Sequence, residues 1–276
     1  RVTLFDEAAE IGGQFNLAKR VPGKEEFHET LRYYKHQLAE VGVEVILGQR
    51  VDGAIIKAGD FDHTVVATGI SPRRPDIPGI DHPMVMGYIE AITGQREVGK
   101  KVAVIGAGGI GFDVTDLITH AGPSAALDIN VFAKEWGIDF EHHPRGGVTG
   151  IEPEVARADR EVWLMQRKET PVGRGLGKTT GWTHRLTLNR RGVHMLNGVQ
   201  YRQIDDRGLH ILVGNEPRLL EVDTVIICAG QESNDGLQHS LQKAGLSSEV
   251  VGGAKEALEL DAKEAINQAS WLAALI

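Results

Sequence analysis

The chain contains very little cysteine, no long apolar run and no dominant basic block. Its 276 residues include one cysteine, Cys228, which excludes an internal disulfide, a Cys-x-x-Cys redox pair and a four-cysteine iron–sulfur site. The apolar runs stay below the roughly 18 residues of a membrane-spanning helix. The formal net charge of −8 disfavours nucleic acid and anionic membrane surfaces as partners. We therefore expect a cytoplasmic protein that binds neither.

Glycine, by contrast, is abundant. The 34 glycines indicate many tight turns between strands and helices, and the length is sufficient for two domains. The sequence starts with Arg1 rather than Met, next to the strand-like run Val2–Phe5. We therefore expect this chain to be a piece of a longer polypeptide.

The most informative stretch is KKVAVIGAGGIGF, residues 100–112. The apolar run Val102–Ile105 lacks polar alternation and predicts a buried parallel strand, and a helix is expected from about Ile110 to Ala121. Between them the glycines follow the G-x-G-x-x-G pattern of dinucleotide-binding turns, in which a diphosphate lies at the helix N-terminus. The candidate diphosphate contacts are Gly106, Gly108, Gly109, Ile110 and Gly111. A glycine-rich turn without a ligand is the alternative.

The strand that selects the cofactor is predicted at Glu161–Gln166. An acid at its tip would accept hydrogen bonds from a free ribose 2′-hydroxyl, but the sequence continues with Arg167 and Lys168. Because these cations favour a 2′-phosphate, the strand tip predicts NADPH rather than NADH. A solvated basic turn is the alternative, and the nearby Glu169 leaves it open.

Further nucleotide signals lie on both sides of this region. Asp6 ends the run Val2–Phe5, where a dinucleotide fold places its ribose-binding acid, although a solvated acidic turn is the alternative. The segment Asp62–Gly69, DHTVVATG, has a counterpart in Asp223–Gly230, DTVIICAG. This repeat indicates two similar halves, each with a strand that ends at a nucleotide, and it makes Gly230 a candidate contact.

The remaining segments carry weaker signals. Gly173–Thr179, GRGLGKT, misses the spacing of a phosphate loop by one residue, so we expect a glycine-rich loop that opens a helix over Thr180–Arg190. Residues 123–160 are interpreted as an inserted loop or a small helical excursion. An amphipathic helix is predicted over Glu25–Glu40. A β-meander is predicted from Val193–Leu196, Gln200–Ile204, His210–Val213 and Arg218–Glu221.

The tail repeats the strand–turn–helix arrangement. Val250–Ala254, VVGGA, predicts a strand and a Gly-Gly turn, and a helix is expected from Leu260 through about Ala274. The start of this helix is a second candidate site for a phosphate or a flavin edge. Asp261 as a helix N-cap without any cofactor is the alternative.

Several stretches together resemble one enzyme family. They are EIGGQFNLAKRVPGKEEF, GAGGIGFDV, QRK followed by GRGLGKTTGW, DTVIICAGQESN and ELDAKEAI. Over nearly its whole length the chain is similar to the C-terminal part of old-yellow-enzyme-type reductases, the family that includes bacterial NADPH-dependent 2,4-dienoyl-CoA reductase and trimethylamine dehydrogenase. Of these members the dienoyl-CoA reductase, an enzyme of fatty acid β-oxidation, is the more similar.

The resemblance implies an α/β fold of two Rossmann-like domains of the pyridine-nucleotide-disulfide-reductase type. An FAD domain without its first strand–loop–helix unit would comprise residues 1–69 and 231–276. After a linker at residues 70–98, an NADPH domain over residues 99–230 would be inserted into it. The family's FAD contacts fall on Asp6, Gly12, Gly13, Gln14, Thr68, Gly69, Gly253, Asp261 and Ala262. Its NADPH contacts fall on the loop Gly106–Gly111 and on Arg167 and Lys168.

The resemblance also implies the chemistry. The chain would be the module that passes a hydride from NADPH to FAD within an NADPH-dependent oxidoreductase of the dienoyl-CoA reductase type. The partner would be the N-terminal barrel of the same polypeptide, absent here, with its FMN and four-iron–four-sulfur cluster. We expect weak FAD binding, because the missing loop normally holds the flavin diphosphate, and no catalytic side chain or metal site in this chain. A non-catalytic nucleotide-binding scaffold with an ADP-type site is the alternative.

Overall fold

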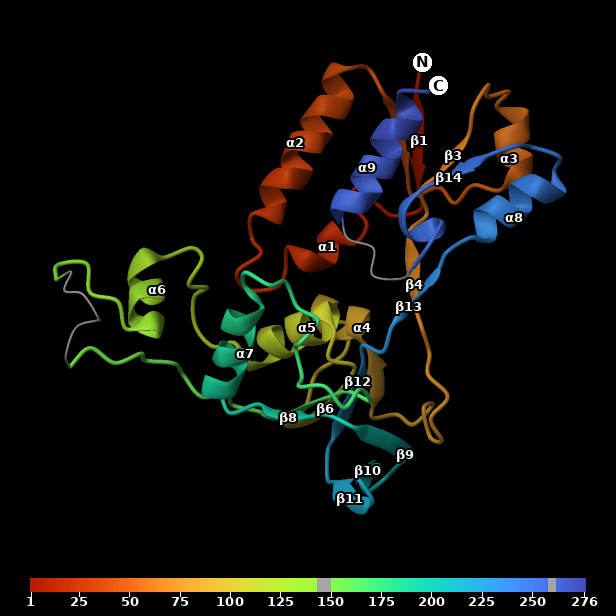
Figure 1. Ribbon diagram of the computed structural model, residues 1–276. Helices are drawn as coiled ribbons and strands as arrows, with labels where there is room; N and C mark the ends of the chain where they lie inside the picture. The colour runs from red at the N-terminus through yellow and green to blue at the C-terminus, as the bar shows by residue number, and fades with distance from the viewer. Residues whose placement is uncertain (143–149, 258–261) are drawn as a thin grey trace. The chain divides into compact units, whose positions relative to one another are not determined.

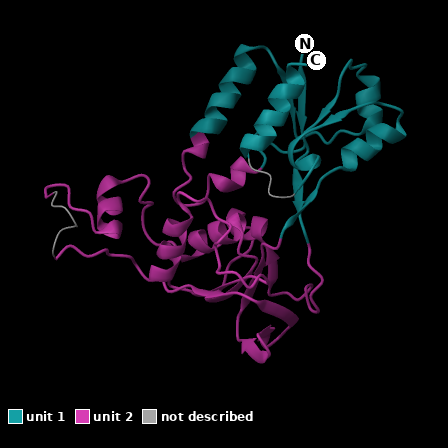
Figure 2. Ribbon diagram, viewed as in Figure 1, with its two compact units in different colours: residues 1–13, 29–73, 230–276 teal, residues 14–28, 74–229 magenta. Residues whose placement is uncertain are grey.

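The computed structural model describes residues 1–142, 150–257 and 262–276, which form two compact units (Figures 1 and 2). The first unit comprises residues 1–13, 29–73 and 230–276. The second unit comprises residues 14–28 and 74–229. Each unit is therefore assembled from segments that are distant in the sequence.

A parallel sheet forms the centre of the second unit. Its strands are β5 (Val85–Gly87), β6 (Lys101–Ile105), β7 (Glu161–Met165), β8 (His194–Leu196) and β12 (Thr224–Ile227). They are hydrogen-bonded in the order β5-β12-β6-β7-β8, and every pair is parallel. In β6 the side chains of Val102, Ala103 and Val104 are all fully buried, as expected of a strand that is covered on both faces. The buried strand predicted before the glycine motif is confirmed.

Two layers cover this sheet. On the face of Val102 and Val104 lie helices of the second unit, namely α1 (Phe15–Ala18), α4 (Tyr88–Thr93), α5 (Gly109–Thr119) and α7 (Gly181–Arg190). On the face of Ala103 and Ile105 lies an antiparallel sheet of β9 (Val199–Asp205), β10 (Gly208–Val213) and β11 (Glu216–Leu220). Alternate residues of β6 thus belong to two separate hydrophobic cores. The predicted insertion at residues 123–160 contains α6 (Ile129–Trp136).

The described strands of the first unit form short two-stranded ladders around a small core. The parallel ladders are β1 (Thr3–Asp6) with β2 (Glu44–Leu47) and β3 (Val65–Val66) with β14 (Glu249–Val250), and the antiparallel ladder is β4 (Ile70–Pro72) with β13 (Gln231–Ser233). The helical elements are α2 (Phe27–Glu40), whose first residues belong to the second unit, α3 (Gly53–Ala58), α8 (Gly236–Lys243), the 3-10 turn η1 (Gly252–Ala254) and α9 (Ala262–Ala273). Ile56, Val66, Leu241 and Ala254 form the core.

Two ranges differ from the sequence predictions. The range Val193–Leu196 does not begin the β-meander, because β8 pairs in parallel with β7 and completes the central sheet. The residues of a strand show its propensity but not which strand it will pair with. Here β8 pairs with the edge of β7 that β6 leaves open. The range 70–98, expected as a linker, contains β4, β5 and α4, and Met86 and Tyr88 within it are buried in the larger core.

Candidate nucleotide-binding site

The carboxyl ends of the central strands meet at one edge of the second unit. The Gly106 N–H donates to the Met165 carbonyl at 2.9 Å, so the glycine loop begins directly beside the tip of β7. The Cys228 N–H donates to the Ile105 carbonyl at 2.8 Å and brings the end of β12 to the same place. Ligands of open α/β sheets bind at such strand ends. The structure thus places the predicted diphosphate loop next to the predicted ribose-selecting tip.

The glycines of the loop differ in how much space surrounds them. Gly106 has a φ of +110°, and a Cβ there would lie 2.5 Å from the Cys228 carbonyl oxygen. A Cβ on Gly111 would lie 1.8 Å from the carbonyl oxygen of Gly106, so only glycine lets α5 approach β6 this closely. Gly108 and Gly109, in contrast, would place a Cβ in open space, with no heavy atom within 4 Å. The backbone is therefore open to a ligand at Gly108 and Gly109.

The start of α5 supplies the hydrogen-bond donors. Gly108 is the N-cap residue and has no side chain with which to cap the helix, and the Phe112 N–H makes the helical bond to the Gly108 carbonyl at 3.0 Å. The N–H groups of the preceding turn have no carbonyl one turn earlier in the helix to bind. Together with the positive end of the helix dipole, they form a cradle for an anion such as a diphosphate.

The basic tip of β7 is held in a defined turn. The Gln166 side-chain amide donates to the Lys168 carbonyl at 3.1 Å, and the Gly198 N–H donates to the same oxygen at 3.0 Å. The side chains of Arg167 and Lys168 are exposed. Neither of them forms an ion pair with Glu169 in the described part of the chain, so both cations are available to a phosphate.

Beside this tip lies a buried phenol. Burial raises the pKa of Tyr201, and the nearby Arg167 guanidinium opposes this only in part. Tyr201 therefore stays protonated at neutral pH. Its hydroxyl is buried and has no hydrogen-bond partner within the described residues.

An ion pair beside the glycine loop was not foreseen in the sequence. Lys24, from the segment 14–28, contacts the Asp113 carboxylate of α5 at 2.6 Å, and the side chains are 32% and 21% exposed. The two residues are 89 positions apart, so no local pattern predicts the contact.

Burial, with a further effect from Asp113, raises the pKa of the Cys228 thiol. Cys228 is thus a buried protonated thiol rather than a nucleophile.

The first unit holds most of the predicted FAD residues. Asp6 is the last residue of β1, and its Oδ1 accepts a hydrogen bond from the Ala8 N–H at 2.9 Å. Gly12 and Gly13 have positive φ angles of 126° and 49°, a backbone conformation that favours glycine. Gln14 occupies the N-cap position of α1 without a capping hydrogen bond from its side chain, and it belongs to the second unit. Its role as a flavin contact stays a prediction.

Residues from three distant parts of the first unit meet around Gly69. A Cβ on Gly253 would lie 3.1 Å from the Gly69 carbonyl carbon, so η1 packs directly on the end of the Thr68-Gly69 segment. The Asn234 N–H donates to the Gly69 carbonyl at 3.0 Å, and the Asn234 side-chain amide donates to the Thr68 carbonyl at 3.3 Å. Gly230 has a φ of +92°. Asn234 is the member of this group that sequence reasoning did not single out.

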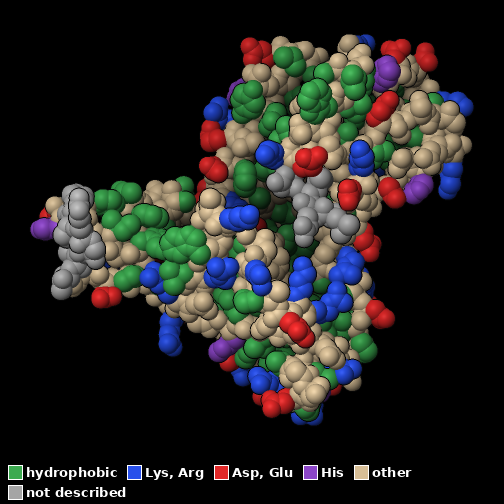
Figure 3. All heavy atoms as spheres, in the orientation of Figure 1, with side chains coloured by type: hydrophobic (Ala, Val, Ile, Leu, Met, Phe, Trp, Pro, Cys, Tyr) green, Lys and Arg blue, Asp and Glu red, His purple; other side chains and the backbone are tan. Residues whose placement is uncertain are grey.

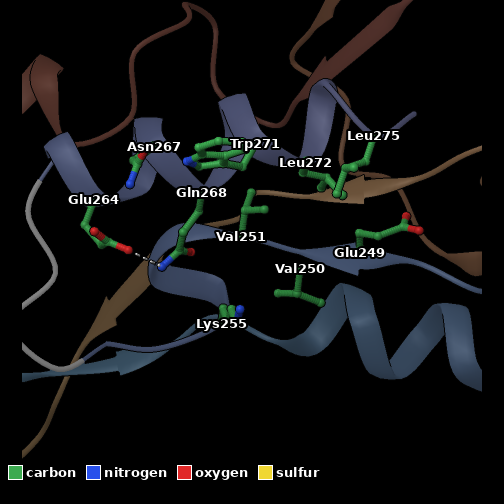
Figure 4. A pocket seen from close by; sticks show the side chains of 10 residues that line it. All are labelled: Glu249, Val250, Val251, Lys255, Glu264, Asn267, Gln268, Trp271, Leu272 and Leu275. Atoms are coloured by element: carbon green, nitrogen blue, oxygen red, sulfur yellow. Dashed lines mark hydrogen bonds between the residues drawn. The ribbon is translucent and has the colours of Figure 1, made fainter.

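The tail helix contributes less to this group. Ala262 is the first residue of α9 and is exposed, and Asp261 lies outside the described residues. Further along α9, Gln268 accepts a hydrogen bond from the Gly252 N–H at 2.9 Å. The Gln268 side-chain amide also donates to Glu264 at 3.2 Å (Figure 4). The same helix lines a pocket of about 480 Å³ with Trp271 and Leu275. None of the predicted cofactor contacts lines this pocket.

No group of three or more His, Cys, Asp or Glu side chains in residues 1–142, 150–257 and 262–276 is arranged to hold a metal ion. Among the described helices, none has the length and apolarity to cross a membrane.

A parallel sheet, a glycine turn at a helix start and a basic strand tip define the second unit as a Rossmann-type dinucleotide-binding domain. The family of pyridine nucleotide-disulphide oxidoreductases matches residues 1–254. The chain belongs to this family, for which binding of FAD and NAD(P)H is typical. The predicted α/β fold of the pyridine-nucleotide-disulfide-reductase type is thereby confirmed.

Similar proteins include larger reductases and a dehydrogenase. A metal reductase of Desulforamulus reducens is 23% identical over 258 residues, which are 92% of this chain and 37% of that protein. The structure of 2-naphthoyl-CoA reductase in complex with 2-naphthoyl-CoA has a TM-score of 0.76 at 23% identity, covering 96% of this chain and 34% of that one. Histamine dehydrogenase from Rhizobium sp. 4-9 has a TM-score of 0.67 at 17% identity, covering 92% and 37%. The chain thus spans about a third of the length of these relatives.

Proposed function

We propose that this chain is the NADPH-binding and FAD-reducing module of a larger cytoplasmic flavoprotein reductase. The observation that carries the proposal is the open backbone at Gly108 and Gly109, in a loop that begins beside the end of β7, where the exposed cations Arg167 and Lys168 follow. The loop suits the diphosphate that all dinucleotides share. The cations suit the 2′-phosphate that only NADPH carries.

The expected preference follows from the charges. A hydrogen bond to a charged group contributes about 1.5–3 kcal/mol, so one such bond from Arg167 or Lys168 to a 2′-phosphate corresponds to a preference of about 10- to 100-fold. Solvent exposure of both side chains places the expectation at the lower end of this range.

The first unit fits part of an FAD molecule. Asp6 keeps its Oδ2 for a ribose hydroxyl, since Oδ1 receives the Ala8 N–H. The close packing of Gly253 on Gly69 provides a backbone surface without side chains for the flavin. When bound, FAD would supply the hydride acceptor, and the residues of this chain would bind and orient the two nucleotides. No acid or base from the chain is required for hydride transfer.

The electron acceptor lies outside this chain in our proposal. The chain spans about a third of the length of similar reductases and dehydrogenases. A polypeptide of that length would include further domains, which could bind further cofactors. We propose a barrel domain with FMN and an iron–sulfur cluster as the electron acceptor, and a dienoyl-CoA as the final substrate. The support for both is the sequence resemblance described above.

A nucleotide-binding scaffold without redox activity is the second candidate. The single thiol Cys228 is buried and is not part of a redox pair, and no metal-binding cluster occurs among the described residues. The absorbance spectrum of the purified chain separates the candidates. A flavin spectrum that NADPH bleaches supports the reductase module. If NADPH never bleaches added FAD, the proposal of a reductase module is wrong and the scaffold function is supported instead.

The diphosphate site is tested with a pair of variants at Gly108. The position has an extended backbone (φ −84°, ψ −170°) and open space around it, so Gly108→Asp and Gly108→Asn both fit and both can cap α5. Only Asp adds a negative charge where the diphosphate would lie. We expect Gly108→Asp to weaken NADPH binding at least tenfold more than Gly108→Asn, because like charges at about 4 Å repel by several kcal/mol near a protein surface. Equal NADPH affinities in calorimetry would exclude this loop as the diphosphate site.

A further inference from the structure

The inserted segment at residues 123–160 exposes a group of large apolar side chains. Each member of this group is at least 37% exposed, and the group comprises Leu127, Ile129, Phe132, Ile138, Phe140 and Ile151. Within the described part of the insertion, no residue belongs to either hydrophobic core of the second unit. Figure 3 shows hydrophobic side chains gathered over this part of the molecule, which Figure 1 labels α6. Because soluble domains rarely leave such a group in water, the insertion has the character of a contact surface.

The helix α6 at the centre of this surface is held in shape at both ends. At its start, the Asp128 carboxylate accepts hydrogen bonds from the N–H groups of Asn130 at 2.8 Å and Val131 at 3.2 Å. At its end, Gly137 has a φ of +66° and terminates the helix in the left-handed conformation. A helix of eight residues is not stable by itself in water, so these caps and the packing of α6 maintain it.

The C-terminal part of α6 is attached to α7 through Trp136. The Trp136 ring meets the Trp182 ring edge-on with centroids 6.1 Å apart, and the Arg190 guanidinium lies 5.6 Å from the Trp136 centroid. This contact leaves Ile129 and Phe132 exposed on the same face of the helix, three residues apart. Ile129, Phe132 and Trp136 follow the i, i+3, i+7 spacing of helices that dock into apolar grooves. The structure thus presents a preformed apolar helix face.

The size of the surface favours a partner within the same polypeptide. A stable dimer of separate chains needs about 20–30 residues from each partner. One short helix and six exposed apolar side chains fall well below that requirement. Domains of one polypeptide associate through smaller contacts, because the covalent link keeps them at a high effective concentration. The chain covers only 37% of the metal reductase and 34% of 2-naphthoyl-CoA reductase, so similar proteins contain further domains that such a contact could hold.

We propose that the apolar face of α6 docks the barrel domain of the same polypeptide, with Ile129 and Phe132 buried in an apolar groove of that domain. The inference rests on the proposed function, because that proposal places a barrel domain in the polypeptide. It adds a contact that holds the electron acceptor to the unit that binds NADPH. None of the proposed nucleotide contacts lies within the insertion, so docking and nucleotide binding use different residues.

The test measures hydrogen exchange of the α6 amides in the whole polypeptide. Ile129→Asp should make them exchange at least about tenfold faster there, because a carboxylate without a partner cannot stay in an apolar groove. The substitution does not weaken α6 itself, since Ile129 is 62% exposed and an acid in the first turn interacts favourably with the helix dipole. In residues 1–276 alone, Ile129→Asp should therefore leave the exchange of α6 unchanged.

Ile55→Asp is the matched control, because Ile55 is an exposed isoleucine in the first turn of α3, a helix that Asp52 caps. It should leave the exchange of α6 in the whole polypeptide unchanged. The docking proposal is overturned if α6 exchanges equally fast in the Ile129→Asp and Ile55→Asp polypeptides. It is also overturned if the exchange in residues 1–276 alone slows as the concentration of this chain rises, because the partner is then a second copy.

Bleaching of the flavin by NADPH, followed in the same samples, tests the proposed function separately. Ile129→Asp should leave this bleaching unchanged, because no proposed nucleotide contact lies in the insertion. An unmodified polypeptide whose flavin is not bleached contradicts the proposed function, whereas the exchange of α6 alone decides the docking.

Discussion

The contact between Gly111 and Gly106 determines how closely α5 approaches β6, and a single methyl group tests it. In Gly111→Ala the new Cβ would begin 1.8 Å from the Gly106 carbonyl oxygen. Ordinary contact distances require a withdrawal of about 1.5 Å. The obstacle is a backbone atom next to a strand, so it cannot rotate away as a side chain would. Helix and strand must therefore separate.

The magnitude follows from two opposing effects. Alanine is favoured over glycine inside a helix by about 1 kcal/mol. Overpacking at a close contact costs about 1–3 kcal/mol, and a collision with rigid backbone lies at the upper end or beyond. We therefore expect Gly111→Ala to lower the free energy of unfolding by about 2 kcal/mol in urea denaturation.

Gly109→Ala is the matched comparison, because Gly109 is also in the first turn of α5 but faces open space. Here only the helix preference applies, so the free energy of unfolding should stay equal or rise by up to about 1 kcal/mol. The two alanine variants should differ in sign. A Gly111→Ala protein as stable as Gly109→Ala would refute the close approach of α5 to β6.

Three further outcomes are expected from the second unit. Lys24→Met should lower the free energy of unfolding by about 1–2 kcal/mol, because it leaves the half-buried Asp113 carboxylate without its partner, and a urea titration of the single and double variants measures the coupling. Burial alone would raise the pKa of Glu25, but hydrogen bonds from Ser124 and the backbone, together with His120, lower it overall. Its contribution to stability is therefore present above about pH 4.5 and is lost as the pH falls further, so unfolding of Glu25→Gln should depend less on pH in that acidic range. Cys228 should react with iodoacetamide only after unfolding, because burial raises its pKa, and rapid labelling of the folded chain would contradict this.

Local sequence patterns were sufficient for the central part of the candidate site. The apolar run before Gly106, the glycine spacing and the helix after it all describe contiguous residues, and β6 and α5 lie where these patterns predict them. The glycines differ in a way that the pattern cannot reveal. Gly111 is required by a backbone contact, whereas Gly108 is free of contacts and open to a ligand.

Contacts between distant residues could not be predicted in this way. The Lys24–Asp113 ion pair and the packing of Gly253 on Gly69 join positions that only the tertiary fold brings together. The assignment of β8 to the parallel sheet depends on its neighbour β7 rather than on its own residues. The same holds for the pocket between α7 and the loop before it, because Trp182 and Arg185 line it from α7 and Arg174 and Lys178 line it from the loop.

The most direct test of the central claim compares NADPH and NADH binding to the chain by calorimetry. The account predicts that NADPH binds about tenfold or more tightly, that Arg167→Gln and Lys168→Gln reduce this ratio mainly by weakening NADPH, and that Arg202→Gln leaves the ratio unchanged. Equal affinities of the unmodified chain for NADPH and NADH would contradict it.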